Sequence, residues 1–148
     1  MKVWVNTKLG ETWEERGETA DDMALLSRRE MYPATVPAQV LVLTCGIDVQ
    51  DDRFELELVG WGVGKESWGI RYQKIYGDPL KPQIWEDLDR FLQTRWRRED
   101  GVVLDILAAA MDTGGHHTDA VYRFCLDRFY RHVYAIKGRG GTETPFVS

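Results

Sequence analysis

The clearest pattern in the chain is an apolar run followed by regular alternation. Residues 40–49, "VLVLTCGIDV", are apolar almost throughout, which is typical of a central strand covered on both faces. The letters "QDD" then indicate a turn, and "RFELELVGWGV" places Phe54, Leu56 and Leu58 on one face and acidic residues on the other. The pattern predicts a first strand over Val40–Val49 and a second strand antiparallel to it.

The next two segments predict a third strand and a helix. In "SWGIRYQKIYG", alternation predicts one apolar face made of Trp68, Ile70 and Tyr72. The period then changes in "DPLKPQIWEDLDRFLQTRWRRED", where apolar residues recur at i, i+3, i+7 and i+11: Trp85, Leu88, Leu92 and Trp96. This spacing predicts a helix that packs on the sheet, with Pro82 in its first turn.

The remaining pattern predicts a strand, a helix and a last strand. "VVLDILAAAMDTGG" is an apolar run that ends in Asp112, and Thr118 is a suitable N-cap for the next helix. The buried face of that helix is predicted to contain Val121, Phe124, Cys125 and Phe129. "HVYAIKG" follows as a strand. The order β-β-β-α-β-α-β predicts an α/β fold with a mixed sheet, whose later strands run parallel through right-handed crossovers.

Residues 1–37 are more polar than the rest of the chain. They contain a helix candidate over Asp21–Glu30 and then "MYPATVPAQV", whose prolines favour extended conformations. We therefore expect a connecting arm over residues 1–37 and a compact domain over residues 38–148.

Composition is consistent with one compact domain and limits its cellular location and its binding partners. The 148 residues, 43% of them apolar, are enough for one core. No apolar run reaches the roughly 20 residues of a membrane span, and no signal peptide is evident, so we expect a cytoplasmic protein without a membrane partner. Cys45 and Cys125 lack metal-site spacing and are expected to be buried, reduced thiols. The net charge of −5 disfavours sequence-independent coating of nucleic acid.

Two aspartates stand at the carboxyl ends of predicted strands. Asp48 lies in a run so apolar that we expect it to be buried, where an isolated carboxylate costs several kcal/mol unless it is paired or bound to a metal ion. Asp112 ends the fourth strand. If these strands are parallel neighbours, about 4.8 Å apart, both carboxylates can reach the same divalent ions. Oxygen ligands suit Mg²⁺ or Mn²⁺, and a two-ion site can hydrolyse phosphodiesters.

Each aspartate also has an interpretation without catalysis. Asp48 could bond the backbone of the "QDD" turn, and Asp112 could cap the loop at Gly114 and Gly115. Solvent exposure is the default for the other acids of this region: Asp51, Asp52, Glu55 and Glu57.

Histidines and basic residues near the predicted strand ends are candidates for DNA contacts. His116 and His117 lack partners at zinc-like spacing, but they precede a helix whose amino end favours anions. Lys137 and Arg139 form a basic loop after the last strand, which could contact phosphates or remain solvated. We name His116, Lys137 and Arg139 as candidate DNA-binding residues. A further basic cluster reads as a solvated helix end: Arg95, Arg97 and Arg98.

At these residues the sequence resembles the nuclease domain of the large terminase subunit of lambda-type tailed phages. The resemblance runs in order through "VNTKLGETWEE", "LTCGIDVQDDRFELELVGWG", "IYGDP", "AAMDTGGHHTDAVYRFC" and "YAIKGRGG". It implies an RNase H-like fold and metal-dependent cleavage of double-stranded DNA, with Asp48 and Asp112 at the positions of the family's first two metal-binding acids. It also implies the partners of genome packaging: the ATPase domain of the same subunit, the small terminase subunit and the portal, in the cytoplasm of the bacterial host.

Two departures from the family's pattern matter. No Gly-x-x-x-x-Gly-Lys-[Ser/Thr] motif is present, so we expect no ATP site here and an arm that follows a missing ATPase domain. The family's third acid comes from a later strand that would follow Ser148, so we expect a domain truncated at its C-terminus, and Glu143 lies in a glycine-rich tail.

Three functional hypotheses follow. The leading one is a metal-dependent DNA endonuclease of a phage or prophage, weak as an isolated chain. The alternative is a catalytically silent module that binds DNA or packaging partners, favoured by the acidic balance and the missing third acid. The third is an RNase H-like transposase or junction nuclease, which would share the chemistry. The sequence does not match those proteins through the fuller run of motifs.

Overall fold

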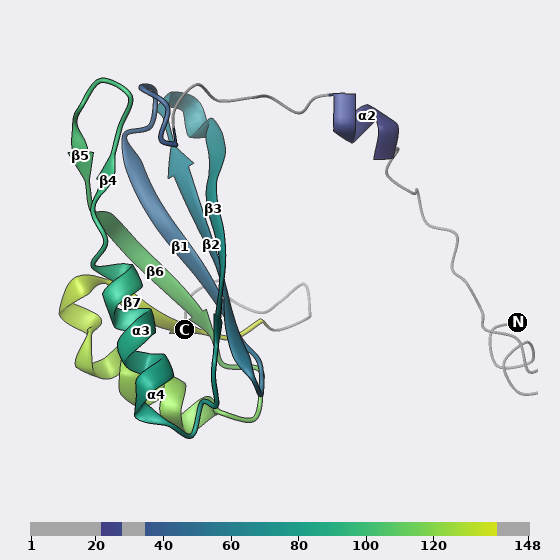
Figure 1. Cartoon of the computed structure of the whole chain (residues 1–148), viewed down its shortest axis with the longest axis vertical. Coiled ribbons are helices and arrows are strands. Elements are labelled where there is room, and N and C mark those ends of the chain that lie inside the picture. The colour runs from purple at the N-terminus through teal and green to yellow at the C-terminus, as the bar shows by residue number, and fades with distance from the viewer. Residues whose placement is uncertain (1–21, 28–34, 139–148) are drawn as a thin grey trace, which may run out of the picture. The chain divides into compact units, whose positions relative to one another are not determined.

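The computed structural model describes residues 22–27 and 35–138 (Figure 1). Residues 22–27 form the short helix α2 (Asp22–Ser27), which belongs to a separate unit and is described by itself. Ser27 Oγ donates a hydrogen bond to Ala24 O at 2.8 Å within this helix. The helix predicted over residues 21–30 is therefore present in part. Most of the predicted arm lies outside the described residues, and the arm remains a prediction.

The second unit is built on a five-stranded sheet with the order β3-β2-β1-β6-β7. Its strands are β1 (Val42–Val49), β2 (Arg53–Trp61), β3 (Ser67–Tyr76), β6 (Ile106–Asp112) and β7 (Val133–Ile136). Strands β1, β2 and β3 are antiparallel neighbours, whereas β6 pairs parallel with β1 and β7 pairs parallel with β6. The predicted mixed sheet, a meander followed by parallel strands, is confirmed.

Two helices and a small hairpin complete this unit. The helices are α3 (Pro82–Leu92) and α4 (Thr118–Asp127), and the hairpin consists of β4 (Trp96–Arg97) and β5 (Val103–Leu104). The short 3₁₀ segments are η2 (Val63–Lys65) and η3 (Phe129–Arg131). Figure 1 shows α3 and α4 on the same side of the sheet. The predicted order of strands and helices is confirmed, with the β4–β5 hairpin inserted after α3.

The core lies between the sheet and these two helices. Trp85 of α3 packs against Phe54 of β2, with ring centroids 4.8 Å apart, and against Phe124 of α4, at 5.2 Å. Other buried side chains come from alternate strand positions and from the inner faces of the helices: Leu43, Cys45, Ile47, Leu56, Leu58, Ile84, Leu88, Ala109, Met111, Val121 and Val133. Because each strand buries alternate residues, its register decides which side chains reach the other face.

The opposite face of the sheet is open where β1 crosses it. Buried residues of β1 alternate with Gly46 and Asp48, which are exposed. The expectation of a first strand covered on both faces is therefore wrong for the part of the chain that the structure describes. The reason is that the outward positions Thr44, Gly46 and Asp48 are small or polar, although the run as a whole is apolar.

A bulge in β3 makes its buried face differ from the predicted one. The pairing of β2 with β3 shifts register between Leu58 and Val59, which leaves Ile70 as an extra residue. Such an insertion reverses the facing of the residues after it. Trp68 is therefore buried in the core, whereas Tyr72 is 57% exposed on the open face.

The helix predicted to include Trp96 ends earlier. Helix α3 ends at Leu92, and Trp96 lies in β4, where its ring packs edge-on against Phe91 with centroids 6.0 Å apart. Arg98, predicted in a solvated helix end, is largely buried and donates to Val40 O at 3.0 Å. The hydrophobic spacing continued past the end of the helix because the hairpin uses Trp96 to cover the same core.

Two details of α4 also differ from prediction. The N-cap residue is His117, and Thr118 is the first helical residue, whose hydroxyl donates to Thr113 O and Gly115 O. Phe129 lies beyond the helix in η3 and is 63% exposed, so its predicted inward position is wrong. The helix ends at Asp127, two residues before that position.

Both cysteines are buried and unpaired, as predicted. Burial raises the pKa of Cys45 to about 12, and that of Cys125 to about 11, so neither thiol is reactive at neutral pH. Among the described residues, no helix is long and apolar enough to cross a membrane.

The helix–sheet core gives a direct test of this architecture. Leu88 of α3 is fully buried, so Leu88→Ala should destabilise the chain by about 2–5 kcal/mol, as large-to-small core substitutions do. Leu80 precedes the same helix and is 78% exposed, so Leu80→Ala should change stability by less than about 0.5 kcal/mol. Urea denaturation of both variants measures the difference. Equal effects would contradict the assigned helix face.

Candidate active site

The structure places Asp48 and Asp112 on adjacent parallel strands. Ile47 of β1 pairs with Met111 of β6, and the two aspartates are the next residues of these strands. Ile47 and Met111 point into the core, so alternation directs both aspartates to the open face. Asp48 is exposed and Asp112 half-buried, so the expected burial of Asp48 is wrong. The expected juxtaposition of the two strands is confirmed.

Each carboxylate is held by a neighbour in its own segment. Gln50 Nε2 donates to Asp48 Oδ2, and the backbone N–H of Gly114 donates to Asp112 Oδ1 at 3.0 Å. A Cβ at position 114 would lie 3.1 Å from Asp112 Oδ2, so glycine allows this close approach. Asp112 thus makes the loop-capping bond of the alternative interpretation, and Asp48 bonds a side chain instead of the turn backbone.

Neither carboxylate of this pair has a cationic partner in the part of the chain that the structure describes. None of the ion pairs among the described residues involves Asp48 or Asp112. Oxygen ligands from two carboxylates suit Mg²⁺ or Mn²⁺, which complete their coordination with water and phosphate oxygens. The same residues contain no group of three or more His, Cys, Asp or Glu positioned to hold a metal ion. The pair could therefore supply only part of a metal site.

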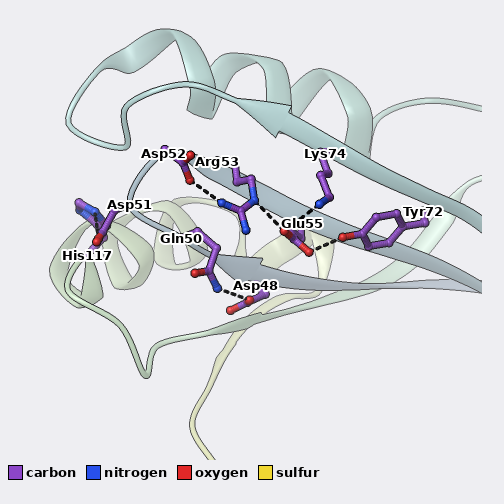
Figure 2. A network of polar contacts seen from close by, with 9 residues as sticks. All are labelled: Asp48, Gln50, Asp51, Asp52, Arg53, Glu55, Tyr72, Lys74 and His117. Atoms are coloured by element: carbon purple, nitrogen blue, oxygen red, sulfur yellow. Dashed lines mark hydrogen bonds and ion pairs between the residues drawn. The ribbon is translucent and has the colours of Figure 1, made fainter.

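Glu55 lies beside the candidate site, and its contacts were not predicted from the sequence. It pairs with Asp48 across β1 and β2 and lies on the same open face. Its carboxylate accepts hydrogen bonds from Tyr72 Oη and Arg53 Nε. It also forms an ion pair with Lys74, whose Nζ lies 3.3 Å away, as Figure 2 shows. Its side chain is only 22% exposed, so solvent exposure is the wrong description. The signal was present in the sequence, because a tight turn at "QDD" sets residues 48 and 55 opposite each other.

The donors around Glu55 keep its carboxylate ionised and engage its oxygens. Hydrogen bonds from Tyr72 and Arg53, with a smaller contribution from Lys74, lower the pKa of Glu55 to about 2 against the opposing effect of desolvation. The same contacts raise the pKa of Tyr72 and of Lys74. A carboxylate already saturated by two cations and a hydroxyl is a poor ligand for a metal ion beside Asp48.

The loops that follow β1 and β6 meet through a histidine–aspartate contact. His116 Nδ1 lies 3.3 Å from Asp51 Oδ1, and His117 Nε2 lies 3.4 Å from the same oxygen without hydrogen-bond geometry. His116 is exposed, whereas His117 is largely buried (Figure 2 shows His117 beside Asp51). This contact joins the two loops next to the aspartate pair. The Asp51 side chain is 73% exposed, so its predicted solvent exposure is confirmed.

The other candidate residues lie at different places. Lys137 is exposed just after β7, which ends beside β6, and Asp119 is exposed in the first turn of α4. Arg139 and Glu143 lie outside the described residues. Glu57 is exposed on the open face, as predicted. No finding tests the DNA-binding roles of His116, Lys137 and Arg139, which stay predictions.

The Glu55 contacts predict a titration. Tyr72→Phe removes the largest cause of the lowered pKa, so the Glu55 carboxyl should titrate closer to its ordinary value of about 4.3 yet below it, because Arg53 and Lys74 remain. In the unchanged chain, the stability that Glu55 contributes is complete above about pH 4.3 and lost as pH falls toward 2. Carboxyl ¹³C NMR measures the shift, with Tyr76→Phe as the control on the same strand. A pKa that stays near 2 in Tyr72→Phe would contradict the assigned bond.

Comparison with known proteins identifies relatives over the whole chain. The family described as "Terminase large subunit gpA, endonuclease domain" matches residues 1–148. The terminase large subunit of Escherichia phage lambda is 38% identical over 148 residues, which cover 99% of this chain and 23% of that protein. The terminase large subunit of Enterobacteria phage P21 is 34% identical over 149 residues, which cover 100% of this chain and 23% of that protein.

No solved structure matches the chain. The chain spans only 23% of the length of these two relatives, so it corresponds to one part of a large subunit. With a family match over every residue, the chain belongs to the gpA-type endonuclease domain family of phage terminase large subunits.

Proposed function

We propose that this domain is a metal-dependent endonuclease that hydrolyses phosphodiester bonds of double-stranded DNA, with Asp48 and Asp112 as its metal-binding and catalytic residues. The observation that carries the proposal is the parallel register of β1 and β6, which sets the two aspartates side by side on an open face. The family match supports nuclease chemistry for the domain as a whole. We further propose an RNase H-like fold, because the βββαβαβ order and the mixed sheet agree with the fold that the family resemblance implies.

The proposed roles follow from what each residue can do. Asp48 and Asp112 would supply oxygen ligands for Mg²⁺ or Mn²⁺, and two bound ions would activate a water and stabilise the leaving oxygen. Gln50 and the Gly114 N–H hold the two carboxylates in fixed directions. The open face leaves room for a duplex to approach them, because Gly46 beside Asp48 carries no side chain.

The site as proposed is short of one acid. Two carboxylates leave one side of a two-ion site without a protein ligand, and Glu55 is committed to Arg53, Tyr72 and Lys74. We therefore propose that the isolated chain is a weak nuclease that prefers Mn²⁺, because Mg²⁺ demands a nearly ideal octahedral set of ligands.

The wider biological role is also a proposal. We propose that the domain cuts DNA for genome packaging in the cytoplasm of the bacterial host, together with an ATPase domain of the same subunit, the small terminase subunit and the portal. Its relatives are large terminase subunits of phages, which supports this setting. A connecting arm over residues 1–37 would link the nuclease domain, residues 38–148, to that ATPase domain.

A second candidate function is a catalytically silent module that binds DNA or packaging partners through the same face. One observation favours it: among the described residues no third metal-binding side chain joins the aspartate pair. Measured metal binding and cleavage separate the two functions.

Metal binding should stabilise the chain through Asp48. An ion at 100 times its dissociation constant adds about 2.7 kcal/mol, which corresponds to a rise in melting temperature of about 5–10 °C for a domain of this size. Asp48→Asn should remove most of the rise caused by Mn²⁺. Glu57→Gln, which removes an exposed carboxylate from the same face, should retain it. Calorimetry measures the melting temperature of the three proteins with and without Mn²⁺. An equal rise in all three would contradict a site at Asp48.

Cleavage should depend on Asp112. Asparagine keeps the oxygen that accepts the Gly114 N–H, so Asp112→Asn removes the charge while preserving the loop. Relaxation of supercoiled plasmid should be slow in Mg²⁺, faster in millimolar Mn²⁺, and at least about 100-fold slower in Asp112→Asn, since even residues that only support metal ligands cost 10–100-fold. The Glu57→Gln variant is the matched control. Absence of cutting by the unchanged chain in either metal would favour the silent module.

A further inference from the structure

A row of polar residues crosses four strands at the level of the aspartate pair. Lys74 of β3 pairs with Glu55 of β2, Glu55 pairs with Asp48 of β1, and Asp112 lies next to Asp48 on β6. Alternation places the whole row on the open face. Its acidic end is the aspartate pair, and its basic end is on the edge strand β3.

We propose that Arg53, Tyr72, Lys74 and Tyr76, here called the β2–β3 surface, bind the phosphate backbone of the DNA beside the aspartate pair. This inference rests on the proposed function, because it requires DNA as the substrate. Two strand spacings, about 10 Å, separate the backbones at Lys74 and Asp48. One DNA strand advances about 3.4 Å per nucleotide along the axis, so phosphates about three nucleotides from the cut fall within reach.

The two cations are oriented by their carboxylate partners and remain accessible. The side chains of Arg53 and Lys74 are 29% and 37% exposed. Arg53 uses Nε and Nη1 for Glu55 and Asp52, and its guanidinium carries further donors on Nη2. Lys74 Nζ lies 3.3 Å from Glu55, a long contact that leaves the ammonium free to turn toward a phosphate. Glu55 is a positioning residue in this scheme, because a cation fixed before binding loses less entropy when the phosphate arrives.

Tyrosines flank the lysine on the same face. Tyr72, Lys74 and Tyr76 occupy alternate positions of β3, and both tyrosines are exposed, at 57% and 70%. Lys74 Nζ lies 5.7 Å from the centre of the Tyr72 ring. Tyrosine hydroxyls are among the groups that contact DNA phosphates. The Tyr72 hydroxyl donates to Glu55, so Tyr76 supplies the hydroxyl donor for a phosphate near the ammonium. Interleaved basic and aromatic residues are typical of nucleic-acid surfaces.

A competing explanation is that Arg53 and Lys74 serve only to balance Glu55 and Asp52. The two cations and two carboxylates sum to zero charge, so in that case the surface would stabilise the sheet without contacting DNA. The salt dependence of DNA binding separates the explanations, because each phosphate contact contributes about −0.9 to the slope of log K against log salt.

The experiment measures binding of the whole chain to a short fluorescent duplex across a salt titration. Asp112→Asn is the background in which cleavage is suppressed, with Mn²⁺ held constant. Adding Lys74→Gln should reduce the slope by about 0.9, and adding both Arg53→Gln and Lys74→Gln by about 1.8. Arg71→Gln is the matched control, because Arg71 pairs with the buried Leu58 and so lies on the opposite face of the same strand. Its slope should stay unchanged.

The outcomes are distinguishable from failure of the proposed function. Equal slopes for Lys74→Gln and Arg71→Gln overturn the β2–β3 surface even if the unchanged chain cuts plasmid. A lower melting temperature for the Arg53 and Lys74 variants with an unchanged slope also overturns it, and assigns the cations to folding alone. If the unchanged chain neither binds the duplex nor cuts plasmid, the proposed function fails and this inference with it.

Discussion

The parallel pairing of β1 with β6 is the interaction on which the candidate site depends. It joins segments that are far apart in the sequence, and its register is set by apolar residues, since Ile47 and Met111 must both reach the core. A slip of one residue on either strand would bury an aspartate and expose a core side chain. The hydrophobic core on one face therefore holds Asp48 and Asp112 in alignment on the other.

The same division into two faces explains where polar chemistry is possible. Trp85, Phe54 and Phe124 fill the space between the sheet and its helices, and no charged side chain is fully buried there among the described residues. On the open face, Glu55 is compensated by Arg53 and Lys74, whereas Asp48 and Asp112 have no cationic partner among the described ion pairs. Negative charge is thus concentrated on β1 and β6.

Much of this arrangement could be predicted from the sequence, because it rests on local signals. Alternation defined the β1–β2 hairpin, the change of period defined α3, and two apolar runs each ending in aspartate predicted parallel neighbours with adjacent acids. The failures came from features that alternation and spacing do not encode. The bulge at Ile70 turned Tyr72 outward, and Trp96 kept helical spacing after the helix had ended. The network around Glu55 required knowing that Lys74 and Tyr72 lie on the neighbouring strand.

The energetics of the aspartate pair argue that it has a role beyond folding. Like charges on adjacent strands destabilise a sheet by a few tenths to about 1 kcal/mol relative to neutral pairs. Glu55, one strand away, shows that this sheet can compensate a carboxylate, since two cations and a hydroxyl surround it. Within the described residues, Asp48 and Asp112 have only an amide and a backbone N–H as hydrogen-bond partners. Local conflicts of this kind concentrate at functional sites. A cation supplied from outside the chain would remove the repulsion, so the binding of a divalent ion and the stability of the β1–β6 pair should be coupled.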